Sequence, residues 1–108
     1  MDELAHNVYR VTKNFPKQEL YGLVSQITRA AISVVLNYIE GYARRKPAVR
    51  LNFLEISFGS LKETQYLLHF TYIEKFLSEE DYKKLSAIAD QVAAMLYTEV
   101  DNLSKSLD

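Results

Sequence analysis

The sequence predicts an all-α protein, an antiparallel up-down-up-down four-helix bundle with a short first helix. Apolar residues recur at spacings of three and four in four separate segments, which is the pattern of helices with one buried side. Only three Gly and two Pro among 108 residues leave little material for the turns of an all-β fold. The connections between segments are short, so consecutive helices should be antiparallel neighbours. We expect one domain, residues 1–108, because this length is typical of a single domain.

The first predicted helix covers Asp2–Asn14 and ends before Pro16, which biases the residue before it away from helical geometry. Leu4, Val8 and Val11 lie on one side of it. A helix of this length spans about 20 Å and cannot cover the longer helices fully. One end of the core therefore needs other protection.

The second predicted helix covers Lys17–Arg45 and is apolar on two sides. Its main stripe contains Leu20, Leu23, Val24, Ile27, Ala31, Val34 and Tyr38, and its other side carries Ile32, Val35, Leu36 and Ile39. A helix that is apolar around much of its circumference must be covered on both sides. In a chain this small, we expect another subunit to provide the second cover.

The third and fourth predicted helices cover Pro47–Lys75 and Ser78–Leu107. Pro47 suits a first helical position, where its missing N–H costs nothing. The third helix is apolar over a wide surface, so we expect it to be the most central. Ser78 is a predicted N-cap, and the acids after it oppose the positive end of the helix dipole.

Composition argues against several classes of protein. The absence of Cys removes disulfides, thiol catalysis and Cys-based metal sites, and it fits the reducing cytoplasm. No run of about 18 apolar residues is present, so no membrane-spanning helix is expected, and the N-terminus lacks the pattern of a signal peptide. His6 and His69 are isolated, and no nucleophile–base set or phosphate-binding Gly loop occurs. We expect no metal, no cofactor, no membrane association and no enzymatic activity.

Charge is unevenly distributed along the chain. Residues 1–54 contain eight Lys or Arg and four Asp or Glu, a balance of +4, whereas residues 55–108 contain five and ten, a balance of −5. This asymmetry either creates a basic surface for an anionic partner or pairs the two halves within the bundle or between subunits.

Two motifs surround the connection between the second and third helices. Asn37, Glu40, Gly41 and Arg44 fit the pattern N-x-x-E-G-x-x-R, and residues 53–63, FLEISFGSLKE, fit F-L-x-x-[AS]-x-G-S-x-x-E. Together with residues 15–31, FPKQELYGLVSQITRAA, these motifs resemble the 23S rRNA-intervening sequence protein family. The resemblance extends over nearly the whole chain.

The resemblance implies a four-helix bundle that forms a homo-oligomer, with a pentameric ring as the form associated with the family. A protein that looks related, the accessory variability determinant of diversity-generating retroelements, binds nucleic acid and a reverse transcriptase. The resemblance therefore also implies RNA or DNA, and a protein such as a reverse transcriptase, as partners. No enzymatic activity is established for the family.

Six residues form a candidate polar network between the second and third helices: Asn37, Glu40, Ser57, Gly59, Ser60 and Glu63. We interpret them as hydrogen-bonding and small residues that fix the packing of the two helices, because a satisfied polar network can specify a unique arrangement. Gly59 and Ser60 should be small to permit close helix approach. The alternative is a ligand or partner site.

The candidate nucleic-acid contacts are Arg44, Arg45, Lys46 and Arg50 at the same connection. One interpretation is that these four cations contact phosphate groups and that the contacts are repeated around an oligomer. The other is that the tip is only solvated, and that its cations stabilise the negative end of the dipole at the C-terminus of the second helix. The leading hypothesis is a non-enzymatic homo-oligomeric scaffold that binds RNA or DNA through this tip. The alternative is a protein-interaction module that docks a partner helix where the first helix ends, without nucleic acid.

Overall fold

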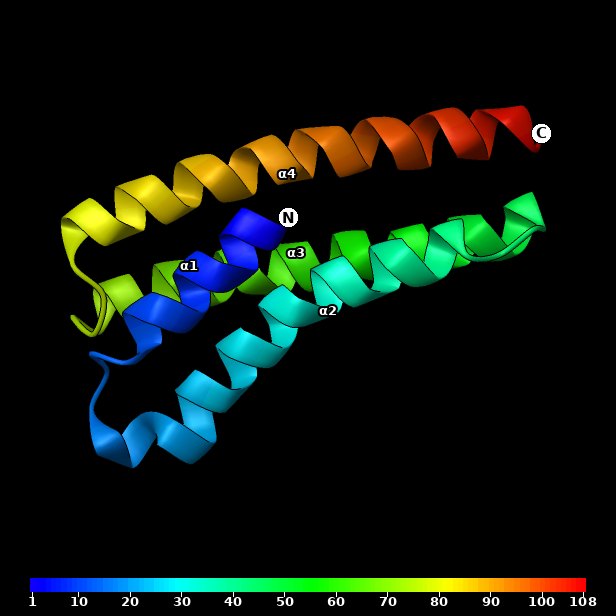
Figure 1. The fold of residues 1–108 in the computed structure, drawn as a ribbon. Coiled ribbons are helices and arrows are strands. Elements are labelled where there is room, and N and C mark those ends of the chain that lie inside the picture. Colours follow the sequence, from blue (N-terminus) through cyan, green and yellow to red (C-terminus); the bar gives the residue numbers. More distant parts are fainter.

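The protein folds as a bundle of helices without strands, described over residues 1–108 in a computed structural model. Its helices are α1 (Asp2–Thr12), α2 (Ser25–Tyr42), α3 (Pro47–Ile73) and α4 (Glu79–Ser106). α1 and α3 each pack between α2 and α4, and consecutive helices run in opposite directions (Figure 1). The predicted all-α four-helix bundle is confirmed.

The main difference from the predicted elements lies before α2. The helical stretch begins at Lys17 as predicted, but it starts with a 3-10 turn, η1 (Lys17–Glu19), and a π-helical turn, η2 (Leu20–Val24). α2 also ends at Tyr42 and not at Arg45. Apolar spacing does not distinguish these tighter and wider turns from a regular helix, so the sequence could not reveal them.

The two ends of the α3–α4 connection follow from specific backbone interactions. Lys75 has a φ of 67°, a left-handed conformation that reverses the chain after α3. The backbone N–H groups of Phe76 and Leu77 then donate to the carbonyl of Thr71, which closes the helix end. Ser78 is the N-cap of α4, as predicted, since its Oγ accepts a 3.1 Å hydrogen bond from the N–H of Asp81.

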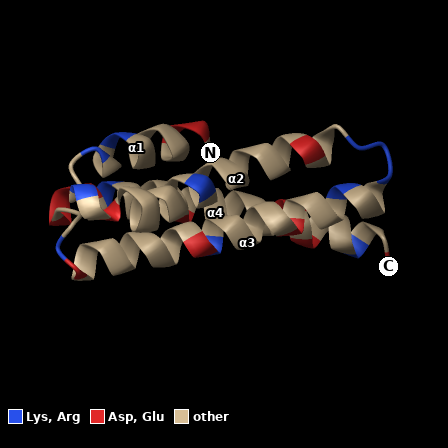
Figure 2. Ribbon diagram, turned by 90° about the horizontal axis from the view of Figure 1, so that it is seen from below, with Lys and Arg blue, Asp and Glu red and all other residues tan.

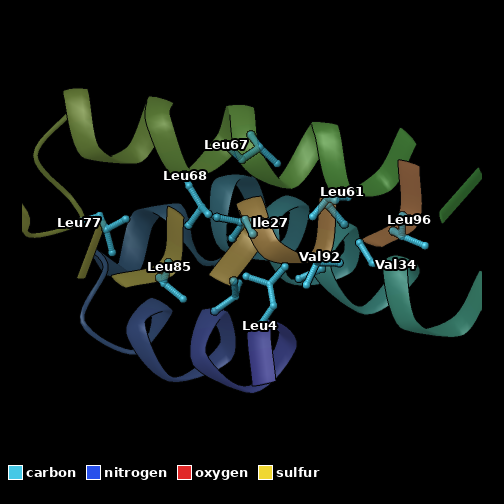
Figure 3. Close-up of a cluster of buried hydrophobic side chains, with 14 of the residues drawn as sticks. Leu4, Ile27, Val34, Leu61, Leu67, Leu68, Leu77, Leu85, Val92 and Leu96 are labelled. Atoms are coloured by element: carbon cyan, nitrogen blue, oxygen red, sulfur yellow. The ribbon is translucent and has the colours of Figure 1, made fainter. Parts of the chain in front are cut away.

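The core lies between all four helices in the half of the bundle that contains α1 (Figure 3). Its fully buried members include Leu4 of α1, Ile27 of α2, Leu61 of α3 and Leu85 of α4. Burying one such side chain stabilises a protein by about 1.5–3 kcal/mol. The apolar stripes read from the sequence therefore meet in one continuous core.

The other half of the bundle lacks a fourth helix. α1 has 11 residues, against 27 in α3 and 28 in α4. At about 1.5 Å per residue it is less than half as long as either. Its N-terminus lies near the middle of the bundle, and α2, α3 and α4 continue beyond it to the α2–α3 connection (Figure 1). The candidate site residues near that connection lie in this three-helix half.

Candidate functional site

The connection between α2 and α3, residues 43–46, forms a basic tip at one end of the elongated molecule (Figure 2). Pro47 begins α3 at the first helical position, as predicted. Three of the four predicted nucleic-acid contacts, Arg44, Arg45 and Lys46, belong to this connection, and Arg50 lies in the first turns of α3.

Arg44 and Arg50 have partners within the chain. Nη2 of Arg44 lies 2.7 Å from Oε2 of Glu40, and its guanidinium lies 5.2 Å from the centre of the Phe53 ring. Nη2 of Arg50 donates a 3.0 Å hydrogen bond to the carbonyl of Arg44, and its guanidinium lies 5.3 Å from the Tyr42 ring. These two cations therefore stabilise the connection itself.

Arg45 and Lys46 differ from their neighbours. Both are exposed, and neither side chain forms a hydrogen bond or an ion pair within the chain. Free, solvated cations at a chain reversal can approach an anionic partner without first breaking an internal interaction. The structure thus divides the four predicted residues into two that are engaged and two that are available.

A cluster that the sequence did not reveal joins α2 to α4 just below the tip. The hydroxyl groups of Tyr38 and Tyr42 donate hydrogen bonds of 3.0 and 2.5 Å to the same oxygen, Oε1 of Glu99. The two rings lie 4.9 Å apart. A sequence pattern gives the spacing of the two tyrosines on one helix, but it gives no information about which residue of α4 lies opposite them.

The carboxylate of Glu99 changes the acidity of both tyrosines. Burial, followed by the hydrogen bond to Glu99, raises the pKa of Tyr38 above its ordinary range. The hydrogen bond to Glu99, followed by burial, raises the pKa of Tyr42. Both effects favour the neutral phenol, because a phenolate beside a carboxylate would be a second negative charge at the same point.

A hollow of about 320 Å³ opens between the tip and α4, and Tyr42, Arg50, Leu54, Glu99, Asn102 and Leu103 line it. Two buried atoms of these residues, Nε of Arg50 and Oε2 of Glu99, have no hydrogen-bond partner. The hollow combines hydrogen-bond donors and acceptors with the apolar side chains of Leu54 and Leu103. It belongs to the three-helix half, where no fourth helix covers the ends of α2 and α4.

The residues of the predicted polar network divide into separate interactions. Nδ2 of Asn37 donates 2.9 Å hydrogen bonds to the carbonyl and the Oγ of Ser33, and Ser33 Oγ lies 2.8 Å from Ser60 Oγ. Ser57, fully buried, donates instead to the carbonyl of Val34. Ser33 is the connecting residue that the motifs did not single out.

The two acidic members of the predicted network lie outside these hydrogen bonds. Glu40 pairs with Arg44 on its own helix. Glu63 is exposed and forms no hydrogen bond or ion pair. It borders a hollow of about 300 Å³ between α2 and α3, which is also lined by Gln26, Arg29, Ala30, Ser33 and Ser60.

The second apolar side of α2 is open to solvent. Ile32, Leu36 and Ile39, which we name the α2 face, are 44%, 57% and 59% exposed. Beside α1 this face borders a hollow of about 320 Å³ that is mainly apolar, lined by Asp2, Ala5, His6, Tyr9, Ile32, Val35 and Leu36. The chain's own helices therefore leave the α2 face uncovered.

The helical stretch Lys17–Tyr42 is apolar enough, with a mean hydropathy of 1.2 over its best window, to cross a membrane by length and composition. One such helix is weak evidence for a membrane span, because a core helix passes the same test, and the expectation of no membrane-spanning helix stays a prediction. The stretch is this apolar because α2 combines core residues such as Ile27 and Val34 with the exposed α2 face. In the bundle the same stretch packs against the other helices.

The sequence of this chain matches a known protein family. Residues 1–98 match the sequence profile of the family described as 23S rRNA-intervening sequence protein. The chain belongs to this family. A search of curated proteins finds no match.

A solved structure supports the same fold for this member of the 23S rRNA-intervening sequence protein family. It is the crystal structure of a protein with unknown function from the S23 ribosomal protein family of Bacteroides thetaiotaomicron. The two chains are 22% identical, the TM-score is 0.81, and the alignment covers 91% of this chain and 92% of the other. At this identity the likeness extends to the fold.

The two glycines of the family motifs have different surroundings. A Cβ at Gly41 would lie 3.3 Å from the carbonyl oxygen of Arg50 and equally close to atoms of Phe53 and Leu54, so α2 and α3 approach each other closely here. A Cβ at Gly59 would meet no atom within 4 Å. The prediction that Gly59 permits close approach of two helices within the chain is wrong, because Gly59 lies on the outer side of α3.

Proposed function

We propose that this protein is a non-enzymatic scaffold that assembles with copies of itself through the α2 face. The observation that carries the proposal is the exposure of three large aliphatic side chains, Ile32, Leu36 and Ile39, in one row of a helix. Their 4- and 3-residue spacing is that of a helix that packs against another helix. Scattered apolar side chains are normal on a protein surface, but a contiguous row next to an apolar hollow marks an interaction site.

Nucleic acid is the second candidate partner, supported by the free cations of the tip. Arg45 and Lys46 are exposed and have no internal partner. The family name also refers to 23S rRNA. One tip offers few phosphate contacts, but an assembly would present several tips at once and gain affinity through avidity. We propose RNA or DNA binding as a property of the assembly.

The α2 face and the apolar hollow between α1 and α2 would also suit a helix of a different protein. Such a partner would use the same apolar surface as a second copy. The two possibilities differ in solution, because only self-association increases the mass of the purified chain.

Multi-angle light scattering of three proteins tests the proposal: the wild type, Leu36→Gln in the α2 face, and Met95→Gln as a matched control. Met95 is 41% exposed but lies on α4, away from the α2 face. We expect an oligomer for the wild type and the control, and a shift towards the monomer for Leu36→Gln. A monomeric wild type over the whole micromolar range would reject self-association. A monomer that binds vesicles or co-purifies with another protein would assign the α2 face to that partner.

A further inference from the structure

The outer side of α3 carries a second row of solvent-accessible residues, separate from the α2 face. It consists of Ile56, Gly59, Glu63, Tyr66, Phe70 and Ile73, at alternating spacings of three and four. Ile56, Tyr66 and Ile73 are 44%, 61% and 56% exposed, and Phe70 is half-buried. We name this set the α3 row. Its spacing repeats every seven residues, which is the period of helices that pack along their length.

Gly59 in this row has no explanation within the chain. Its φ is not positive, so no left-handed turn requires a glycine, and its missing side chain makes room for no neighbouring atom. A glycine in the middle of a helix costs about 1 kcal/mol relative to alanine. In an exposed row between Ile56 and Glu63, a missing side chain lets another helix backbone approach closely. No neighbour within this chain therefore accounts for the glycine at this position.

The α2 face has the same spacing as the α3 row and a different shape. Ile32, Leu36 and Ile39 project branched side chains, whereas the α3 row has a gap at Gly59 between Ile56 and Glu63. The projecting side chains of the α2 face can fill the gap in the α3 row, in the same way that the side chains of one packed helix fill the grooves of its neighbour.

The charges of the two rows are also complementary. Arg29 lies three residues before Ile32 on α2, and Glu63 lies within the α3 row. Both are exposed, and neither forms an ion pair within the chain although they border the same hollow. Contact between α2 of one copy and α3 of another would bring these two opposite charges together.

We infer that the α2 face of one copy docks against the α3 row of the next copy, with the closest approach at Gly59. The inference rests on the proposed self-association and specifies its geometry. Two different surfaces then meet at every contact, so the interface is head-to-tail. Each copy contributes its α2 face to one contact and its α3 row to another. Such an interface produces a ring where the rotation closes and a filament where it does not.

Gly59→Gln tests the α3 row without disturbing the monomer. The new side chain has open space around it, and Gln is a better helix former than Gly, so the monomer should be at least as stable as the wild type. The side chain would hold a docked helix away, and we expect the dissociation constant of the assembly to rise at least tenfold, roughly 1.4 kcal/mol. Tyr66→Glu, at a 61% exposed position of the same row, provides a second variant.

Mixing complementary variants decides between head-to-tail and symmetric contacts. Leu36→Gln keeps an intact α3 row, and Gly59→Gln keeps an intact α2 face. We expect each variant alone to scatter as a 12.5 kDa monomer and their equimolar mixture to form a heterodimer of twice that mass. If the α2 face paired with its own copy, Gly59→Gln would assemble alone and would not combine with Leu36→Gln.

The outcomes separate the inference from the proposed function. Assembly of Gly59→Gln and Tyr66→Glu to the wild-type mass, with Leu36→Gln monomeric, would overturn the head-to-tail contact and leave self-association through the α2 face intact. A monomeric wild type would overturn both.

Discussion

Ser57 of α3 donates a 2.6 Å hydrogen bond from its Oγ to the backbone carbonyl of Val34 in α2, at a position that solvent does not reach. The bond joins two helices at a fixed register. We expect Ser57→Ala to destabilise the fold by about 1 kcal/mol, the typical value of one buried hydrogen bond. Thermal unfolding followed by circular dichroism should show a midpoint lower by roughly 4–8 °C. Ser104→Ala, at a half-buried serine without a side-chain hydrogen bond, should leave the midpoint unchanged.

Gly41 and Gly59 should respond differently to the same substitution. Gly59→Ala places a methyl group in open space and should raise stability by about 1 kcal/mol. Gly41→Ala places its methyl group 3.3 Å from a backbone oxygen and two side-chain carbons, so the helix gain is offset by crowding between α2 and α3. Both should be measured in the Leu36→Gln background, which removes any contribution of assembly. Equal stabilisation by the two substitutions would contradict the close contact at Gly41.

The tyrosine–carboxylate cluster should make stability fall at high pH. Tyr38 and Tyr42 have pKa values raised in the folded state above the ordinary value of 10.0, so the folded protein holds protons that the unfolded chain releases. This contribution is complete below about pH 10 and disappears as the pH rises through the folded-state values. Glu99→Gln removes the negative charge beside both phenols. We expect the tyrosinate absorbance of this variant to develop at lower pH than in the wild type, and an unchanged titration curve would contradict the assignment.

The free cations of the tip should govern affinity for nucleic acid. Arg45→Ala combined with Lys46→Ala should weaken binding to a short fluorescent RNA, measured by anisotropy at several salt concentrations. The slope of log affinity against log salt should decrease by about one for each phosphate that the variant no longer neutralises. Lys83→Ala combined with Lys84→Ala removes the same charge from exposed positions of α4 and should have little effect. An equal decrease in affinity for the two double variants would show that only net charge matters.

Much of the fold could be predicted from the sequence because its signals are local. The apolar spacing of Leu4 and Val8, Pro47 at a helix start and Ser78 at a helix cap all act within one helical segment, and the structure bears out each of them. The turns of η1 and η2 escaped prediction because they leave the apolar spacing almost unchanged.

The site was less predictable because it depends on contacts between helices. The pairing of Glu99 with Tyr38 and Tyr42 requires the register of α4 against α2, which no local pattern contains. The motifs identified both glycines but could not show which one faces a neighbouring helix. Exposure of Leu36 could be anticipated, since a helix that is apolar on two sides cannot be covered by a short α1.

Sedimentation velocity of the full wild-type chain across the micromolar range measures self-association through the α2 face without any added partner. We expect a species heavier than the 12.5 kDa chain at every concentration above the dissociation constant, and its conversion to the monomer by Leu36→Gln. A single 12.5 kDa species at all concentrations, identical for the wild type and Leu36→Gln, would contradict self-association through this face.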